Sequence, residues 1–409
     1  MKKLLTLALM AAAATTAFSQ EALVKEAKKL LGKGEFAQAR TTLAPALTSA
    51  ETEDKAEAWN LKSDIDYQEF VKISEAASKG EAADSMQLFR CAIDAWKAAL
   101  ECDKYDQQPD AKGKVKIKYR QELQNRFKTH GVALVQAGQY LYNKKQNAAA
   151  LEAWKSYVDM GKTSVFEGVK DFPVDPFYND IVYYTAFLAY QEKNYSDAIK
   201  YATILSQVPE QAEQAGEILL FAKKDNCKTH EDTLAFINEL KELHKAHPEV
   251  QRYYNMLQEH YTRSGDMAAL LAWANEEVAL NAQNKTAWFL KGYALMQQEK
   301  WDDAVEAFKK CNEIDPEYTE GYFNTGVCLN SKARELQDKL ADKNTGTISK
   351  VNFEKVKAVL AESKGFLEKA RELDPNREKC NWAYPLWQVY YALGDTANAD
   401  AMEKLNNQR

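Results

Sequence analysis

The sequence predicts an all-α protein in which helical hairpins stack into a solenoid. Two consecutive blocks between Gln251 and Tyr318 superimpose at a fixed period of about 34 residues, and related spacings of bulky and small residues lie on either side. The length of 409 residues would suggest two or three globular domains. A repeat array overrides that expectation, because it grows by adding units rather than by enlarging one core.

The second of the two blocks shows which residues set the period. Small residues such as Gly292 and Ala304 let two helices approach closely, and large ones such as Trp288 and Phe308 fill the space beside them. Pro316 ends the second helix because it has no backbone N–H to donate. The block is therefore predicted to be one helix–turn–helix unit.

This pattern resembles the tetratricopeptide repeat family, whose units are helix–turn–helix pairs. The resemblance covers nearly all of the chain after residue 19, as roughly nine units. It is strongest over 251–326 and weakest over 210–248. It implies a right-handed superhelical solenoid of helix–turn–helix repeats with extended helical hairpins.

Residues 1–19 are predicted to be a secretory signal peptide. Two lysines precede the apolar run 4–14, and the small residues Ala17 and Ser19 precede the expected cleavage site. The run is shorter than the ~18 apolar residues that would span a bilayer. No cysteine follows at the position that a lipoprotein requires. We therefore expect a periplasmic protein that begins near Gln20 and has no membrane span.

Residues 20–160 are expected to hold about three units with insertions. The second unit has Trp59 in its first helix, but Trp96 of its second helix arrives late against the period. Both helices are therefore predicted to be long, with a turn near 78–81. The charged stretch 112–126 indicates an added helix, or an extension of the next helix, before the third unit.

Residues 161–178 contain two prolines and no helical period, so they are predicted to form a long loop. Residues 179–409 are expected to hold about six units. The second helix of the eighth unit ends late, so an insertion at 331–355 is predicted to be a helical hairpin that turns at 344–346. Pro385 departs from the pattern in the first helix of the last unit.

Composition argues against several classes of function. The formal net charge is −6, becoming −8 without the two signal-peptide lysines, so the basic surface that nucleic acid requires is not expected. The basic run from Lys112 to Arg120 leaves contact with a membrane surface or a polyanion open. Six cysteines are too few for a disulfide scaffold. Cys311 and Cys328 are predicted to be buried core residues, with a disulfide between them as the alternative.

Motifs for chemistry are missing from the sequence. It contains no glycine-rich phosphate loop, no serine-centred nucleophile elbow and no His-Glu-x-x-His run. The best metal candidate would combine Cys227 and His230 with His244 and His247. Residues 232–246 are predicted to form one helix, which would separate the two pairs by about 20 Å. We therefore expect no catalytic residue, no metal site and no cofactor.

The family resemblance implies a concave groove lined by exposed side chains from the first helix of each unit. Aromatic and methionine side chains beside amides and arginine suit an extended peptide or a partner helix. Phe187 and Phe289 could instead pack on the adjacent helix, whereas the polar tips of Tyr183, Tyr293 and Arg263 favour exposure. The predicted groove residues are Asp180, Tyr183, Phe187, Tyr190, Gln191, Asn255, Glu259, Arg263, Phe289, Tyr293, Met296, Gln297, Phe323 and Asn330.

The predicted function is a non-catalytic scaffold or adaptor in the periplasm. It would bind segments of partner proteins of the cell envelope in this groove, during envelope or secretion assembly. One alternative is a module that binds cell wall or glycan, which tryptophans clustered on the concave face would favour; Trp59, Trp96, Trp154 and Trp288 occupy core positions instead. The other alternative is an enzyme whose site lies in the insertions or in residues 161–178.

Overall fold

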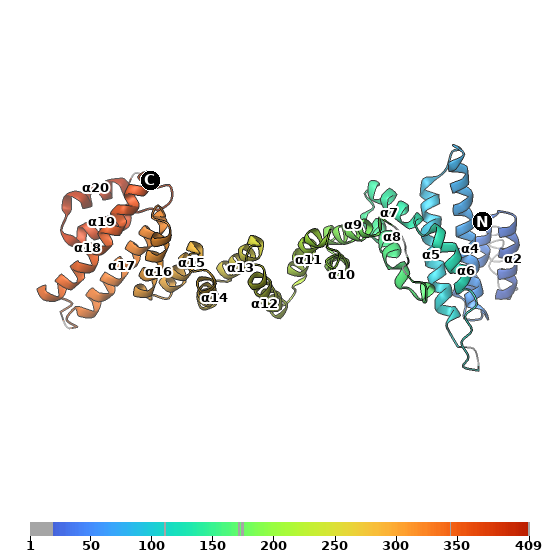
Figure 1. Cartoon of the computed structure of the whole chain (residues 1–409), viewed down its shortest axis with the longest axis horizontal. Helices are drawn as coiled ribbons and strands as arrows, with labels where there is room; N and C mark the ends of the chain where they lie inside the picture. The colour runs from blue at the N-terminus through green and yellow to red at the C-terminus, as the bar shows by residue number, and fades with distance from the viewer. Residues whose placement is uncertain (1–18, 110–111, 171, 173–175, 344, 408–409) are drawn as a thin grey trace, which may run out of the picture. The chain divides into compact units, whose positions relative to one another are not determined.

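The computed structural model describes residues 19–109, 112–170, 172, 176–343 and 345–407. These residues form nineteen α-helices and two short 3-10 turns, and no strand occurs among them (Figure 1). Most consecutive helices pair into hairpins that pack on a neighbour in chain order. The predicted all-α helical-repeat fold is thus confirmed. No helix among the described residues is long and apolar enough to cross a membrane, and the predicted signal peptide lies outside them except for Ser19.

The chain divides into two compact units, one up to Phe236 and one from Ile237 onward. The first unit contains four complete hairpins and an added helix, α6. Its α4 and α5 have 24 and 22 residues, so the predicted long second hairpin is confirmed. The helices are α2 (Gln20–Gly32), α3 (Phe36–Thr48), α4 (Lys55–Ser78), α5 (Ser85–Asp106), α6 (Arg120–His130), α7 (Ala133–Asn143), α8 (Asn147–Asp159), α9 (Tyr178–Gln191), α10 (Tyr195–Leu205) and α11 (Ala212–Asn226).

The second unit contains four hairpins, and the boundary between the units runs through α12. Its α17 and α18 have 22 and 24 residues and form the extended hairpin that the late helix ending predicted. Pro385 lies in the first turn of α19, where its missing N–H would have no partner within the helix. The helices are α12 (His230–Ala246), α13 (Gln251–Ser264), α14 (Met267–Leu280), α15 (Lys285–Gln297), α16 (Trp301–Ile314), α17 (Thr319–Leu340), α18 (Lys350–Leu373), α19 (Ala383–Leu393) and α20 (Thr396–Asn406).

Two segments differ from their sequence-based predictions. The charged stretch 112–126 is helical only from Arg120, and its residues 112–119 form no helix. The predicted loop at 161–178 overlaps two 3-10 turns, and Phe166 within it is buried. The Phe166 ring stacks on Phe172 at 4.1 Å between centroids and lies 6.3 Å from Trp96. This segment is therefore fastened to the core of the first unit by aromatic contacts that no helical period could reveal.

Within a hairpin, a glycine on the first helix meets a large side chain on the second. A Cβ added to Gly292 would lie 2.8 Å from the ring of Phe308, closer than van der Waals contact permits. At Gly138 an added Cβ would lie 2.2 Å from the indole nitrogen of Trp154. These glycines are required because the partner's ring occupies the space of a side chain.

We expect the substitution Gly292→Ala to lower the free energy of unfolding by roughly 1–3 kcal/mol, because the added methyl group overpacks against Phe308. Gly365→Ala on α18 is the matched control, since nothing lies within 4 Å of its added Cβ. It should raise stability by about 0.5–1 kcal/mol through helix propensity. Urea denaturation of both variants measures the difference; equal effects of the two substitutions would show that the close contact is not required.

Candidate functional site

Five of the predicted groove residues lie on α9 in the first unit. Phe187 is exposed, and its ring lies nearly parallel to that of the half-buried Tyr183, with centroids 6.2 Å apart and planes at 9°. Gln191 and Asp180 are exposed, but Asp180 accepts a hydrogen bond from Gln211 at 3.2 Å. These side chains share one exposed side of the helix.

Tyr190 is bound within the unit rather than available on its surface. Its hydroxyl donates to Asp225 at 2.8 Å and joins α9 to α11. Burial, together with this hydrogen bond to a carboxylate, raises the pKa of Tyr190 to about 12. The side chain therefore stays a neutral donor whose hydrogen bond fixes the position of α11.

The sequence reasoning missed Tyr184, which is 50% exposed beside Tyr183. The Tyr184 ring lies 6.1 Å from that of Trp154 on α8, and Trp154 lies 5.8 Å from Tyr142 on α7. Trp154 is buried, as predicted, and its ring packs against those of Tyr142 and Tyr184. We call Tyr142, Trp154, Tyr183, Tyr184 and Phe187 the α7–α9 aromatic surface. Tyr184 directly follows Tyr183 in the sequence. The repeat pattern assigns position 183 to the groove but not position 184, so Tyr184 was not predicted.

On α13 the predicted residues form a polar, exposed surface. Asn255 and Arg263 are exposed and Glu259 is half-buried. The Arg263 guanidinium pairs with Glu259 at 2.7 Å one turn earlier on the same helix. An ion pair of this kind in solvent contributes little to stability, so these groups can exchange their partners at small cost.

The predicted residues on α15 and α17 mostly serve packing. Phe289 meets Phe308 and Tyr318 with ring centroids 5.6 and 5.9 Å apart, so it is a core contact. Asn330 donates to the carbonyl of Pro385 at 3.2 Å and accepts from Ser363 at 3.3 Å. The remaining predicted positions are Tyr293, Met296 and Phe323, which are half-buried, and Gln297, which is exposed.

A second aromatic surface, which the sequence analysis did not single out, lies on α19. Tyr384 and Tyr391 are 52% and 71% exposed, with the partly exposed Trp387 between them. Successive ring centroids lie 5.8 and 5.9 Å apart, with planes at 26° and 28°. The spacing of three and four residues places all three on one helix face. We call these residues the α19 ladder.

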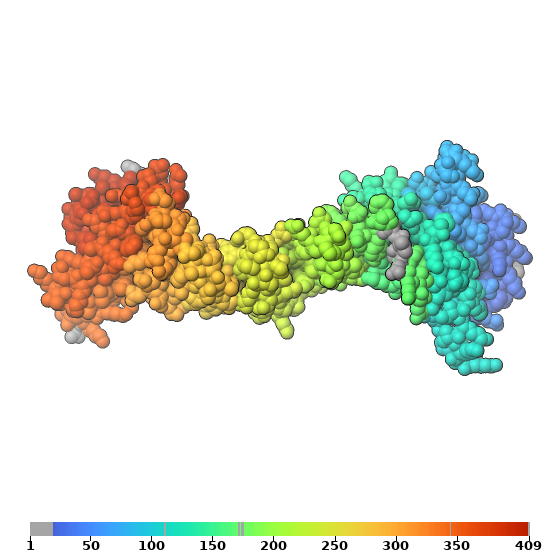
Figure 2. Space-filling view, viewed as in Figure 1, coloured from blue at the N-terminus to red at the C-terminus, as the bar shows by residue number. Residues whose placement is uncertain are grey.

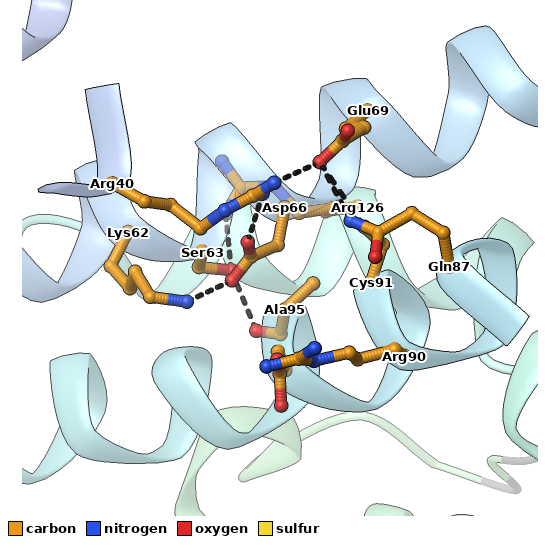
Figure 3. A network of polar contacts seen from close by, with 11 residues as sticks. Arg40, Lys62, Ser63, Asp66, Glu69, Gln87, Arg90, Cys91, Ala95 and Arg126 are labelled. Atoms are coloured by element: carbon orange, nitrogen blue, oxygen red, sulfur yellow. Dashed lines mark hydrogen bonds and ion pairs between the residues drawn. The ribbon is translucent and has the colours of Figure 1, made fainter. Parts of the chain in front are cut away.

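A network of charged side chains joins α3, α4 and α5 (Figure 3). Arg40 donates to the buried Asp66 at 2.8 Å and also to Glu69, and Lys62 pairs with Asp66. Glu69 further accepts from the Cys91 thiol at 3.4 Å. Burial, assisted by Glu69, raises the pKa of Cys91 to about 12, which keeps the thiol protonated. Each charge has a partner, so the network is suited to fixing the hairpin α4–α5 on α3 rather than to catalysis.

The other thiols are also poor nucleophiles. Burial raises the pKa of Cys311, Cys328 and Cys380 to about 12 in each case. Cys311 and Cys328 are free and buried, which confirms that they are core residues. The part of the chain that the structure describes contains no group of three or more His, Cys, Asp or Glu side chains that could hold a metal ion.

A cavity of about 410 Å³ lies beside the C-terminal end of α12. The buried His244 lies against it, with its Nε2 3.1 Å from the buried Glu277 carboxylate. The His244 Nδ1 has no hydrogen-bond partner among the residues that the structure describes, and it is sealed from solvent. His244 and His230 lie at opposite ends of the continuous helix α12, as predicted. The polar atoms are therefore not presented to the cavity.

Residues 286–318, which span α15 and α16, match the tetratricopeptide repeat family. A comparison with curated proteins gives no match. Solved structures that resemble the chain include a TPR repeats protein from Bacteroides fragilis, at 17% identity and a TM-score of 0.32, covering 64% of this chain and 98% of that one. The TPR domain of P58(IPK) is 12% identical with a TM-score of 0.25, covering 96% and 99%. These scores are too low to support a particular function.

We expect Asp66→Ala to lower the free energy of unfolding by about 3 kcal/mol, because it leaves Arg40 and Lys62 without their buried anion. Glu26→Ala is the control, since it removes one partner of an exposed ion pair with Lys29 and should change stability by less than about 0.5 kcal/mol. Guanidinium denaturation compares the two. Similar losses for both variants would contradict a structural role for the network.

Proposed function

We propose that this chain is a non-catalytic scaffold that binds segments of partner proteins on the exposed faces of its hairpins. The observation that carries the proposal is the α7–α9 aromatic surface, where Tyr184 and Phe187 stay 50% and 37% exposed. Contacts with Tyr183 and the buried Trp154 hold these rings in place. Aromatic side chains that are already ordered lose little entropy on binding and dominate interface energetics.

We further propose that the scaffold acts in the periplasm, in envelope or secretion assembly. The support is the N-terminal sequence, in which two lysines, an apolar run and small residues at Ala17 and Ser19 form a signal-peptide pattern. The helix α2 begins at Gln20, directly after the expected cleavage site. Cleavage there would leave every helix of the described chain whole.

The α19 ladder favours a second candidate function, the binding of cell wall or glycan. Trp387 is a partly exposed tryptophan that packs against the core, and exposed tyrosines flank it on one face of the first helix of the last hairpin. Its ring and those of Tyr384 and Tyr391 offer apolar surface beside polar tips, a combination that suits a ligand with both characters.

We expect purified protein to capture a partner protein from envelope extract, and the double variant Tyr184→Ala/Phe187→Ala to lose most of that capture, because the anchoring rings are removed. A matched control is Leu234→Ala/Val351→Ala, which also removes two exposed apolar side chains and should capture normally. Pull-down with quantitative mass spectrometry measures the recovery, after circular dichroism has shown that the variants are folded.

Capture that the double variant retains would contradict the α7–α9 aromatic surface as the binding site. No captured protein, together with retention on insoluble cell wall, would favour the glycan alternative. In that case the variant Tyr384→Ala/Trp387→Ala/Tyr391→Ala should abolish retention.

We expect intact-mass analysis of the protein from cells to give a chain that begins at Gln20 in the periplasmic fraction. Ala17→Arg should accumulate uncleaved precursor, because a small residue is needed at that position. Thr16→Arg, one residue earlier, is the control and should be processed normally. A full-length chain in the cytoplasmic fraction of wild-type cells would contradict export.

A further inference from the structure

Helix α2 begins at Gln20 and lies at the surface of the first unit, in the darkest blue of Figures 1 and 2. Ser19 precedes it as the N-cap, and Gln20 is the first residue with helical geometry. Cleavage of the signal peptide after Ser19 would therefore leave a chain whose first residue is a glutamine in the first turn of a helix.

This cleavage would also remove the cap of α2. The Ser19 carbonyl accepts from the backbone N–H groups of Ala22 and Leu23 at 2.9 and 3.3 Å, and the Ser19 hydroxyl accepts from that of Ala22 at 3.3 Å. Those acceptors leave with the signal peptide, and a new ammonium group appears on Gln20. Positive charge is unfavourable there, because the helix dipole has its positive end at the N-terminus. A change that removes the charge would therefore stabilise the new end of the helix.

The side chain of Gln20 can supply that change. Its Oε1 has no hydrogen-bond partner, so the carboxamide can turn toward the nitrogen of the same residue without breaking a bond to that oxygen. The nitrogen is free to react as well, because the first N–H groups of a helix have no acceptor within it. The positive end of the dipole disfavours the protonated amine, and the neutral amine is the nucleophile.

We propose that Gln20 is a modification site, at which the new N-terminal glutamine cyclises to pyroglutamate. The neutral amine nitrogen attacks Cδ of its own side chain, so that an N–Cδ bond forms and the Cδ–Nε2 bond breaks. The amine gives up one proton, the leaving nitrogen takes it up, and ammonia departs. No oxidant, reductant or further reactant is needed. The product is a lactam, which carries no charge at the start of α2. The proposal rests on export and on cleavage after Ser19, as proposed above.

Both the residue type and the position are specific for this reaction. Glutamine closes an unstrained ring, whereas the shorter side chain of asparagine would have to close a strained one. Glu21 cannot react in the same way, because its nitrogen lies in a peptide bond.

Cyclisation would also protect the first turn of α2. The Glu21 carboxylate accepts from the backbone N–H of Glu53 at 3.1 Å and so ties this turn to the chain before α4. Aminopeptidases need a free amine at the first residue, and a lactam does not offer one. A cyclised chain would therefore keep Glu21 and its contact in a compartment that contains such enzymes.

The test is intact-mass and N-terminal peptide analysis of the protein from the periplasmic fraction. We expect most wild-type chains to begin at residue 20, to be lighter than the encoded chain by one molecule of ammonia, and to give no reaction with an amine-directed label at that residue. Gln20→Asn should be exported and cleaved in the same way but keep its ammonia and its reactive amine. Glu21→Gln is the matched control, because it places an amide beside no free amine, and it should cyclise at Gln20 like the wild type.

A synthetic peptide with the sequence of residues 20–32 controls for cyclisation during handling. Carried through the same purification steps, it should keep its amine. Cyclisation of the peptide to the same extent as the protein would show that the loss of ammonia arises in preparation, and would overturn the proposal.

The remaining outcomes separate cyclisation from export. A chain that begins at Gln20 with its amine intact, or one that begins at another residue, would overturn cyclisation and leave export standing. A full-length chain would contradict both, because Gln20 would never become the first residue. Partner capture by the α7–α9 aromatic surface should be unchanged in Gln20→Asn, so the scaffold function does not depend on the result.

Discussion

The structure depends on a close contact between a small residue on the first helix of a hairpin and a large side chain on the second. Phe308 fills the space beside Gly292, and Trp154 fills the space beside Gly138. This contact sets the distance between the two helix axes and uses one side of each first helix. The other sides of a first helix are free of that constraint, and on α9 the rings of Tyr184 and Phe187 stay exposed. Packing thus determines which residues are available for binding.

One of the two interrupted units adds polar networks to this packing, whereas the other, α17–α18, keeps a close contact between Gly326 and Leu367. The long hairpin α4–α5 is tied to α3 through Arg40 and Asp66, and to α6 through Arg126, which donates to Ser63 at 2.7 Å. Hydrogen bonds and ion pairs are directional, so a buried network of this kind permits one register and disfavours slipped ones. Apolar packing alone would constrain two helices of this length less strictly.

The sequence correctly predicted the structural features that follow from the repeat period. It predicted the paired helices, the long hairpins and the burial of Trp154, Cys311 and Cys328, because each follows from spacing and residue size. It did not reveal the α19 ladder or Tyr184, because exposure depends on what the neighbouring helices cover. It left open whether Phe289 lines the groove or packs on an adjacent helix, and the ring packs against Phe308 and Tyr318. A position in a repeat identifies a face of a helix, but not whether an adjacent ring already fills the space.

The same reasoning separates residues that hold the fold from residues that can bind. Tyr190 and Asn330 occupy groove positions, yet their polar groups are used by Asp225 and by Pro385 and Ser363. Binding a ligand through them would require breaking bonds that position α11 and α19. The side chains of Tyr391 and Val115 are instead exposed to solvent. A ligand that covers them would gain buried apolar area without a compensating loss inside the protein. In a scaffold built from repeats, the side chains that stability does not use are therefore those on which binding specificity can change most freely.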